Sequence, residues 1–292
     1  MTLDGLGETE LLRRILPYLS TSGYQVVAGE DDAAVWRSLD PDHPQDYVVA
    51  SCDTSVEGIH FDLSWMNAVD AGHRALALAL GDLAAKGAEP KYVLVALAAP
   101  RTWPVENVTG IYGGLHRVAE RYDMLIAGGD TTATSGPAVL TLTVLGTVAE
   151  VPLPRSRVQA GWSVGVTGAL GAGAAALRER RVFLPEPRFE AGATLNGAGF
   201  CCGDISDGLV REMEKFAAAS GVGSVIRANE VPRVEGASVE DALTGGEEAE
   251  LVCVGPTDAV VRSGLRVVGE MTGTEVKVEG ATLRSAGYDH FA

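Results

Sequence analysis

The sequence predicts two mixed α/β (α+β) domains, and three observations support this fold class. Strand-like and helix-like apolar patterns alternate along the chain. The 292 residues are long for one domain and comfortable for two. A Pro-, Arg- and Gly-rich stretch, VPLPRSRVQAG at 151–161, divides the chain near its middle. We therefore expect an N-terminal domain at 1–150 and a C-terminal domain at 151–292.

The first half begins with a predicted helix in MTLDGLGETELLRRILPYL and continues with alternating strands and helices. A second helix is predicted at 71–86, with Asp70 as its N-cap and Gly87 just beyond its end. A third fits 104–121, where Pro104 opens a segment whose apolar residues recur at helical spacing. Short apolar runs predict strands at 47–52, 92–97, 124–127 and 138–148.

The second half restarts the same alternation. WSVGVTG is strand-like, GAGAAALRER is helical, and PEPR at 185–188 is a loop. A further helix is expected to open at Ser206 and to close at Gly221. The turn GALGAG at 168–173 has the dinucleotide fingerprint reversed, and no P-loop motif is present, so we interpret it as a tight turn.

Composition narrows the class of partner. The formal net charge is −16, so no basic surface is available for nucleic acid, and a phosphate-bearing substrate would need a metal ion or placed arginines. No apolar run is long enough for a membrane span, and the first residues lack a signal-peptide pattern. The four cysteines show no framework spacing, which favours reduced thiols and a cytoplasmic location.

Acidic residues recur where the expected elements begin or end. They are Asp31, Asp32, Asp53, Asp82, Asp130, Asp204 and Asp207. Strand ends and helix starts meet at one rim of an α/β sheet, so we expect these carboxylates to converge. Crowded carboxylates repel one another unless divalent cations bind them, and Mg²⁺ prefers oxygen ligands and substrate phosphates. The pattern therefore predicts a site in which carboxylates hold Mg²⁺ and Mg²⁺ holds phosphate.

Each residue taken singly has a simpler interpretation. Asp53 and Asp130 could be turn residues. Asp82 could merely pair with Lys86 four residues on, although its apolar neighbours make a purely solvated charge unfavourable. His60, seven residues after Asp53, could be structural. The two acids at the helix start could serve only the helix dipole. The repetition of the pattern favours a functional site.

The order of motifs along the chain resembles that of the thiamine-monophosphate kinase family, within the superfamily of aminoimidazole-ribotide and selenophosphate synthetases. The matching motifs run almost end to end. They are EDDAAV, SCDTSVEGIHF, ALALGDLAAKGAEP, AGGDTT, PRSRVQAGW, VTGALG, PEPR, DISDGL, LTGGEEAEL and GYDHF. The resemblance implies two α/β domains, with the N-terminal domains of a homodimer pairing through an intermolecular β-barrel.

The resemblance also implies site residues, cofactors and substrates. The implied metal ligands are Asp32, Ser51, Cys52, Asp53, Asp82, Asp130, Asp204 and Asp207. The implied ATP contacts are Gly129, Asp130, Arg155 and Ser206. The implied contacts to thiamine monophosphate are His60, Glu247 and Tyr288. Catalysis would rest on Asp53, Asp130 and Arg155. The implied cofactors are ATP and several Mg²⁺ ions, with K⁺ as a further candidate.

The implied reaction is phosphorylation of thiamine monophosphate to thiamine diphosphate by direct transfer from ATP. An ionised phosphate oxygen needs no general base, so positioning and charge neutralisation would suffice. This sequence departs from the family pattern at Glu30, Cys52 and Gly81, which stand for Gly, Thr and Ser, and at Ala249, which replaces an aromatic residue. The alternatives are another ATP-using synthetase of the superfamily and a catalytically inactive nucleotide-binding homologue.

Overall fold

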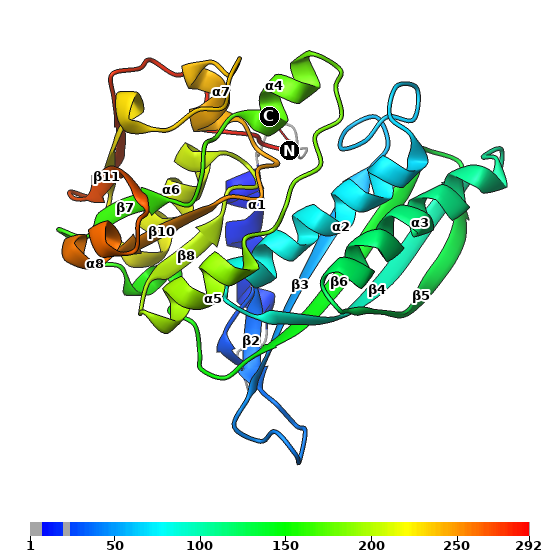
Figure 1. Ribbon diagram of the computed structural model, residues 1–292, viewed down its shortest axis with the longest axis horizontal. Helices are drawn as coiled ribbons and strands as arrows, with labels where there is room; N and C mark the ends of the chain where they lie inside the picture. The colour runs from blue at the N-terminus through cyan, green and yellow to red at the C-terminus, as the bar shows by residue number, and fades with distance from the viewer. Residues whose placement is uncertain (1–7, 20–23, 292) are drawn as a thin grey trace.

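The computed structural model describes residues 8–19 and 24–291, where the chain forms two six-stranded sheets with helices packed on them (Figure 1). This arrangement confirms the predicted mixed α/β fold class. The first sheet comes from the first half of the chain and the second sheet from the second half. The segment between them, 149–162, contains the boundary that we propose between residues 150 and 151.

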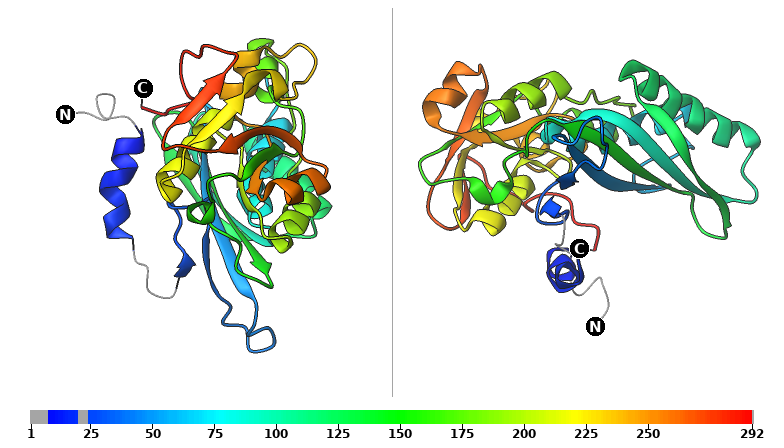
Figure 2. Two further views of the ribbon diagram at one scale, coloured as in Figure 1. Left: turned by 90° about the vertical axis from the view of Figure 1, so that its left-hand side faces the viewer. Right: turned by 90° about the horizontal axis from the view of Figure 1, so that it is seen from below.

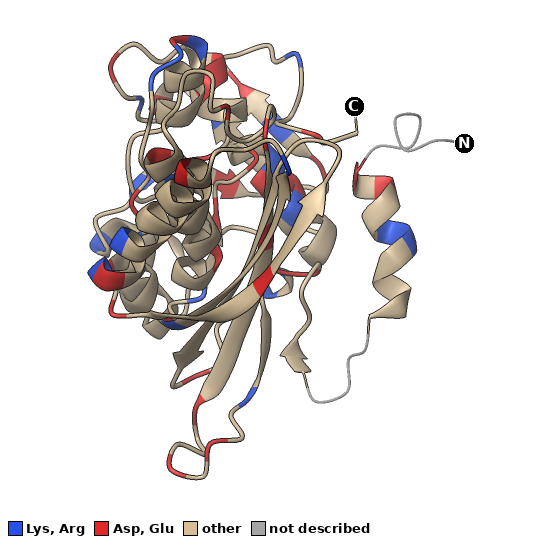
Figure 3. Cartoon of the chain, turned by 90° about the vertical axis from the view of Figure 1, so that its right-hand side faces the viewer, with Lys and Arg blue, Asp and Glu red and all other residues tan. Residues whose placement is uncertain are grey.

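The first sheet has the order β1-β2-β3-β6-β4-β5, in which β4 and β5 are parallel and the other neighbours antiparallel. Its strands are β1 (Tyr24–Val26), β2 (Ala34–Arg37), β3 (Tyr47–Val56), β4 (Glu89–Pro100), β5 (Leu125–Thr134) and β6 (Val139–Val148). Helices α2 (Ala68–Ala85) and α3 (Val105–Arg121) cover one face. Helix α1 (Glu8–Ile15) stands on the other side of the sheet (Figure 2, Figure 3).

Alternation along β4 explains why only one face of this sheet carries helices. Val93 and Val95 are fully buried and belong to the same core as Leu80 of α2, whereas Tyr92 and Leu94 point the other way and are exposed. A period of two places successive side chains on opposite faces of a strand. The helices thus cover the apolar face that includes Val93 and Val95.

The second sheet has the order β12-β9-β11-β7-β10-β8, with β12 and β9 parallel. Its strands are β7 (Ser163–Val166), β8 (Cys201–Asp204), β9 (Ser224–Arg227), β10 (Leu251–Gly255), β11 (Arg266–Met271) and β12 (Val276–Glu279). The accompanying helices are α4 (Ala172–Arg178), α5 (Phe189–Gly197), α6 (Leu209–Ser220), α7 (Val239–Thr244) and α8 (Thr257–Arg262). The residues of β7, β8 and β10 are all buried, so these strands form the centre of this half.

The helix predictions hold in position but not in every cap. The structure confirms a first helix at Glu8–Ile15; residues 1–7 of that prediction lie outside the described residues. Helix α2 begins three residues earlier than expected, because Asn67 is its N-cap and accepts from the Asp70 backbone N–H at 2.8 Å. Helix α6 begins after Gly208 rather than at Ser206. Its end at Gly221, in the left-handed conformation, is as predicted.

Two strands run further than expected, which changes where their acids lie. β3 continues through Val56 and pairs with β6 along its whole length, so Asp53 lies inside the strand rather than after it. β5 continues to Thr134 and likewise contains Asp130. Polar and β-branched residues extend both strands because one side of the sheet carries no helix.

The expectation of reduced cysteines does not hold for one pair. Cys202 of β8 and Cys253 of β10 are directly opposite in the antiparallel register and form a disulfide. The strand pairing brings together two residues that are far apart in sequence, which spacing alone cannot reveal. Cys52 and Cys201 are free. Within the described ranges, no helix is long and apolar enough to cross a membrane.

Candidate functional site

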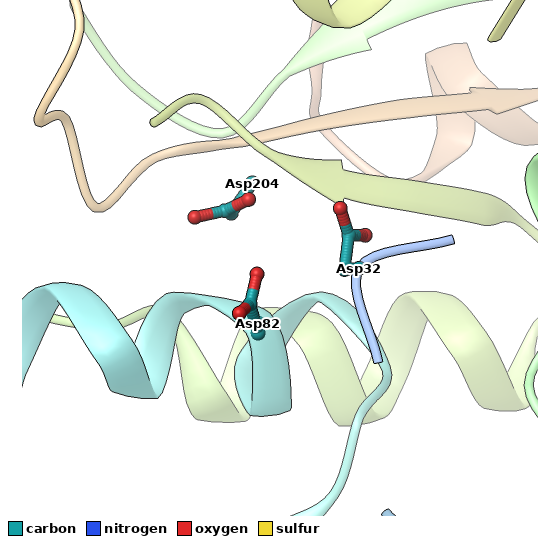
Figure 4. A group of neighbouring side chains, drawn as sticks. All are labelled: Asp32, Asp82 and Asp204. Carbon is teal, nitrogen blue, oxygen red and sulfur yellow. The ribbon is translucent and has the colours of Figure 1, made fainter. Parts of the chain in front are cut away.

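Three of the predicted metal ligands converge between the two sheets. Asp32 lies in the loop between β1 and β2, Asp82 inside α2, and Asp204 at the end of β8 (Figure 4). One carboxylate oxygen from each lies within 4.8 Å of the other two. The cluster of Asp32, Asp82 and Asp204, hereafter the acidic site, therefore combines residues from both halves of the chain.

The acidic site is electrostatically crowded. Burial, followed by repulsion from neighbouring carboxylates, raises the pKa of Asp82 and of Asp204 well above the usual range. Burial would also raise the pKa of Asp32, but Arg155 and Lys86 more than offset it and lower that pKa overall. One oxygen of Asp32, Oδ2, is buried and lies 3.1 Å from the Lys86 ammonium group. A set of crowded, buried carboxylates fits a divalent cation, which would offset their mutual repulsion.

Strand β3 carries predicted metal ligands on both of its faces. Ser51 donates to Asp82 Oδ2 at 2.5 Å, so its hydroxyl joins the acidic site. Asp53 lies on the same face, and burial and then Asp207 raise its pKa to about 6. The thiol of Cys52 is exposed on the opposite face, where Thr143 donates to it at 3.5 Å. The side chain of Cys52 therefore does not reach the acidic site, which leaves only its backbone carbonyl as a ligand.

Asp130 and Gly129 are not brought together with the acidic site in this chain. Both lie in the edge strand β5, which is separated from β3 by β6 and β4, and both are exposed. Three strand spacings amount to about 14 Å. Within this chain the expected convergence does not include Asp130, because it lies inside the edge strand β5 rather than at a strand end near the other acids.

Arg155 is buried among acids rather than open to solvent. It lies in a short 3₁₀ turn (Arg155–Arg157), and its side chain contacts Asp32 and donates from Nε to Glu212 at 2.7 Å. Lys215 adds a second cation, 3.0 Å from Asp207 and 3.5 Å from Glu212. Glu212 and Lys215 were missed in the sequence. The signal for Glu212 was its place on the apolar face of α6, where a charge needs a partner.

A cavity of about 220 Å³ is lined by residues of both halves of the chain. Its polar lining includes His60, Asp62, Arg74, Arg180, Arg181 and Glu247. Glu247 has a left-handed backbone, and its carboxylate contacts the Arg74 guanidinium, which also donates to the Phe183 carbonyl at 3.2 Å. Arg74 was missed in the sequence. It lies eight residues before Asp82 on α2, a distance of about 12 Å along the helix.

Two further predicted contacts lie beside this cavity. The Tyr288 ring packs edge-on against His290, whose ring centroid is 5.2 Å from that of His60. The Ser206 carbonyl accepts from the Glu247 backbone N–H at 2.7 Å. The structure therefore groups His60, Glu247, Tyr288 and Ser206 in one region.

Gly81, one of the departures from the family pattern, lies against the acidic site and leads to a prediction. A Cβ at position 81 would lie 2.8 Å from Asp204 Oδ2, so a larger residue would displace that carboxylate. Gly81→Ala should gain up to about 1 kcal/mol of helix propensity yet weaken Mg²⁺ binding at least roughly tenfold. Calorimetric titration with Mg²⁺ measures the second effect. Gly113→Ala is the matched control, because that helical glycine has open space around it. Normal Mg²⁺ affinity in Gly81→Ala would contradict the prediction.

Glu248, in the altered LTGGEEAEL motif, binds the backbone at the start of α4. Its carboxylate accepts from the backbone N–H groups of Gly171 and Gly173 at 2.9 and 3.0 Å. Burial nevertheless raises its pKa to about 7. The folded state thus holds this proton more tightly than the unfolded state, so the group makes the protein less stable as pH rises from about 4.5 to about 7.

Glu248→Gln should therefore gain stability relative to the parent protein across that pH range, by up to about 1.4 kcal/mol per pH unit. Urea unfolding at several pH values measures the difference. Glu279→Gln, at an exposed position, should follow the parent at every pH. A constant offset between Glu248→Gln and the parent would show that Glu248 does not titrate in this range.

Comparison with known proteins places the first half of the chain in the class of AIR synthase related proteins, because the family model of their N-terminal domain matches residues 30–148. The thiamine-monophosphate kinase of Rhodopirellula baltica is 35% identical over 81% of this chain and 79% of its own. That of Bacillus subtilis is 32% identical over 84% and 82%. The chain belongs to the thiamine-monophosphate kinase family. Among solved structures, "AaThiL complexed with AMPPCP and TMP" superimposes with a TM-score of 0.87 at 26% identity, over 99% of both chains.

Proposed function

We propose that this protein phosphorylates thiamine monophosphate to thiamine diphosphate, with ATP as the donor and Mg²⁺ as the cofactor. Family membership across most of the chain supports this reaction. The observation that carries it is the acidic site, in which three carboxylates from both halves of the chain converge. Both phosphates are anionic, and the protein carries a net charge of −16, so bound cations are needed to bring them together.

We assign Mg²⁺ ligation to the acidic site, to Asp53 and Asp207, and to the backbone around Ser51 and Cys52. When bound, Mg²⁺ would neutralise the charge that develops on the transferring phosphoryl group. Asp82 on α2, Asp204 at the end of β8 and Asp32 in the loop before β2 would hold the ion in place. We assign Ser206 and Gly129 to the nucleotide. Arg155 is assigned there as well, and we propose that it acts through Asp32, which it contacts.

We propose that the cavity binds the thiamine rings. Its distance from Asp82 along α2 suits a molecule whose phosphate lies at the acidic site and whose rings lie near Arg74. Glu247 provides a carboxylate for the cationic thiazolium or the aminopyrimidine, and Tyr288 with His60 provides flat rings beside it. The contact with the Arg74 guanidinium fixes the position of the Glu247 carboxylate.

Glu247→Ala should accordingly raise the KM for thiamine monophosphate at least roughly tenfold, with the KM for ATP nearly unchanged. Steady-state kinetics in both substrates separates the two. Glu179→Ala, an exposed acid at the end of α4, serves as the control. An equal rise in both KM values would indicate a general disturbance of the fold, and no change in either would remove Glu247 from the substrate site.

We also propose that two copies pair through the N-terminal sheets to form an intermolecular β-barrel. The face of β4 and β5 opposite α2 and α3 exposes Tyr92, Leu94 and Leu125, each more than 40% accessible. Paired copies would cover these side chains and give Asp130 new neighbours. Light scattering should give the mass of a dimer, and Leu94→Asp should shift it toward the monomer. A monomer at micromolar concentration for the parent protein would refute the pairing.

Incubation with ATP, Mg²⁺ and thiamine monophosphate tests the main proposal. Formation of thiamine diphosphate and ADP in equal amounts is the expected result. ADP without thiamine diphosphate would favour another ATP-using synthetase. ATP binding without turnover would favour the inactive homologue, which the altered motif around Ala249 motivates. ATP affinity should also fall when a chelator removes Mg²⁺, and an unchanged affinity would overturn the metal assignment.

A further inference from the structure

Lys86 is fully buried at the C-terminal end of α2, and its ammonium group has oxygen neighbours from two other segments. It contacts Asp31 Oδ1, lies 3.1 Å from Asp32 Oδ2, and donates to the Cys202 carbonyl at 2.8 Å. Asp31 and Asp32 belong to the loop before β2, and Cys202 belongs to β8 of the second sheet. One ammonium therefore joins α2 to the acidic loop and to the other half of the protein.

The charge of this lysine is stabilised where it lies. Removing an ammonium from water is costly unless carboxylates and further acceptors surround it. Burial alone would lower the pKa of Lys86, but Asp31 and Asp32 raise it above its usual range. The group therefore remains a cation. Its oxygen neighbours are also the kind that a free monovalent cation takes, since ammonium and potassium ions are of similar size.

Lys86 stands close to the proposed metal ligands without occupying their place. The Asp32 carboxylate faces both the Lys86 ammonium group and the acidic site. Asp204 follows Cys202 by two residues on the same strand. The simpler alternative, an ion pair with Asp82 four residues earlier, is not formed. Movement of this ammonium would shift Asp32 and β8 relative to each other.

We propose that Lys86 is a positioning residue that acts as a tethered monovalent cation, holding Asp31 and Asp32 against β8 so that Asp32 and Asp204 keep their spacing. This role rests on the proposed function only in taking the acidic site as the Mg²⁺ site. Removal of the lysine side-chain charge should leave a vacancy that potassium or ammonium ions from solution can fill.

Lys86→Met tests the proposal because it keeps the chain length and removes the charge. Thermal unfolding is measured in chelator, without Mg²⁺, in choline chloride and in potassium or ammonium chloride at equal ionic strength. In choline, the variant should melt roughly 10 °C below the parent, because two buried carboxylates lose a partner. Potassium or ammonium should restore at least about half of that loss by binding the folded state.

Lys91→Met is the matched control, since Lys91 lies near the surface and pairs with Glu89. The control and the parent should show no difference between choline and potassium beyond about 2 °C. An equal loss for Lys86→Met in every salt, or the same potassium response in parent and variant, would overturn the tethered-cation role. Neither outcome depends on catalysis or on Mg²⁺, so this arm is independent of the proposed function.

A double variant keeps the test decisive if Lys86→Met does not fold. Lys86→Met with Asp31→Asn removes the cation and one counter-charge together, and it should fold with little dependence on the salt. A full potassium response in the double variant would overturn the proposal.

Calorimetric titration with Mg²⁺ tests whether Lys86 positions the acidic site. Mg²⁺ affinity of Lys86→Met should be at least tenfold weaker in choline than in potassium, while that of the parent should match in both. A parent that binds no Mg²⁺ refutes the proposed metal site, whereas equal Mg²⁺ affinities in the variant refute positioning by Lys86.

Discussion

Asp82→Asn should reduce phosphoryl transfer by on the order of 10³-fold, yet stabilise the protein in the absence of metal. The loss of activity is expected because a neutral amide is a poor substitute for a carboxylate beside Mg²⁺. The gain in stability follows from the raised pKa of Asp82. Burial, and then Asp204 and Asp53, disfavour its ionised form in the folded protein.

The gain in stability from Asp82→Asn should increase as the pH rises. Because the folded protein holds the Asp82 proton more tightly than the unfolded chain does, ionisation costs stability as pH rises above about 3.8. Asn cannot ionise, and it can still accept from Ser51. The advantage of the variant should therefore grow with pH in chelator and shrink when Mg²⁺ is added to the parent.

Urea unfolding with and without Mg²⁺, together with product formation, measures both effects. Asp258→Asn, at an exposed position in the first turn of α8, is the control and should change neither. Activity near that of the parent in Asp82→Asn would show that Asp82 is only an ion-pair or packing residue. A metal-free variant less stable than the parent would show that the acidic site is not crowded.

Arg155→Ala should lower the free energy of unfolding by about 3–5 kcal/mol, the largest loss that we expect for a single substitution here. Asp31, Asp32 and Glu212 would remain buried with one cation fewer. Breaking a buried ion pair from one side costs much more than removing a surface charge. The melting temperature should fall by roughly 6–15 °C.

Arg157→Ala is a close control, because Arg157 lies in the same 3₁₀ turn but is exposed. It should leave stability within about 0.5 kcal/mol of the parent. If Arg155 served only as an ATP contact, Arg155→Ala would keep its stability and raise the KM for ATP alone. Chemical denaturation and ATP kinetics on the same preparations distinguish these results.

The fold class was predictable because its signals are local. The apolar periodicity around Leu80 and the strand runs at Val93 and Val95 depend on a few neighbouring residues, and the structure confirms both elements. Caps and strand ends were less predictable. Asn67 displaced Asp70 as the cap, and β3 ran on through Asp53, because pairing with another strand overrides local turn preferences.

The candidate site was predictable in its residue types but not in all its partners. Asp32, Asp82 and Asp204 were singled out, and they converge. The sequence offered Lys86 only as an alternative partner for Asp82 within the same helix, whereas it reaches Asp31 and β8. The disulfide and the burial of Arg155 could not be predicted from the sequence either. Long-range contacts of this kind depend on how the two sheets pack, which no local pattern encodes.

The acidic site draws its carboxylates from both halves of the chain, and this has a consequence for folding. A cation held by Asp32, Asp82 and Asp204 binds only when both sheets are formed and docked. By mass action it stabilises that docked state in proportion to the logarithm of its free concentration. Amide hydrogen exchange in β3 and in β8 should therefore slow together as Mg²⁺ is added, so that the two halves open as one cooperative unit rather than separately.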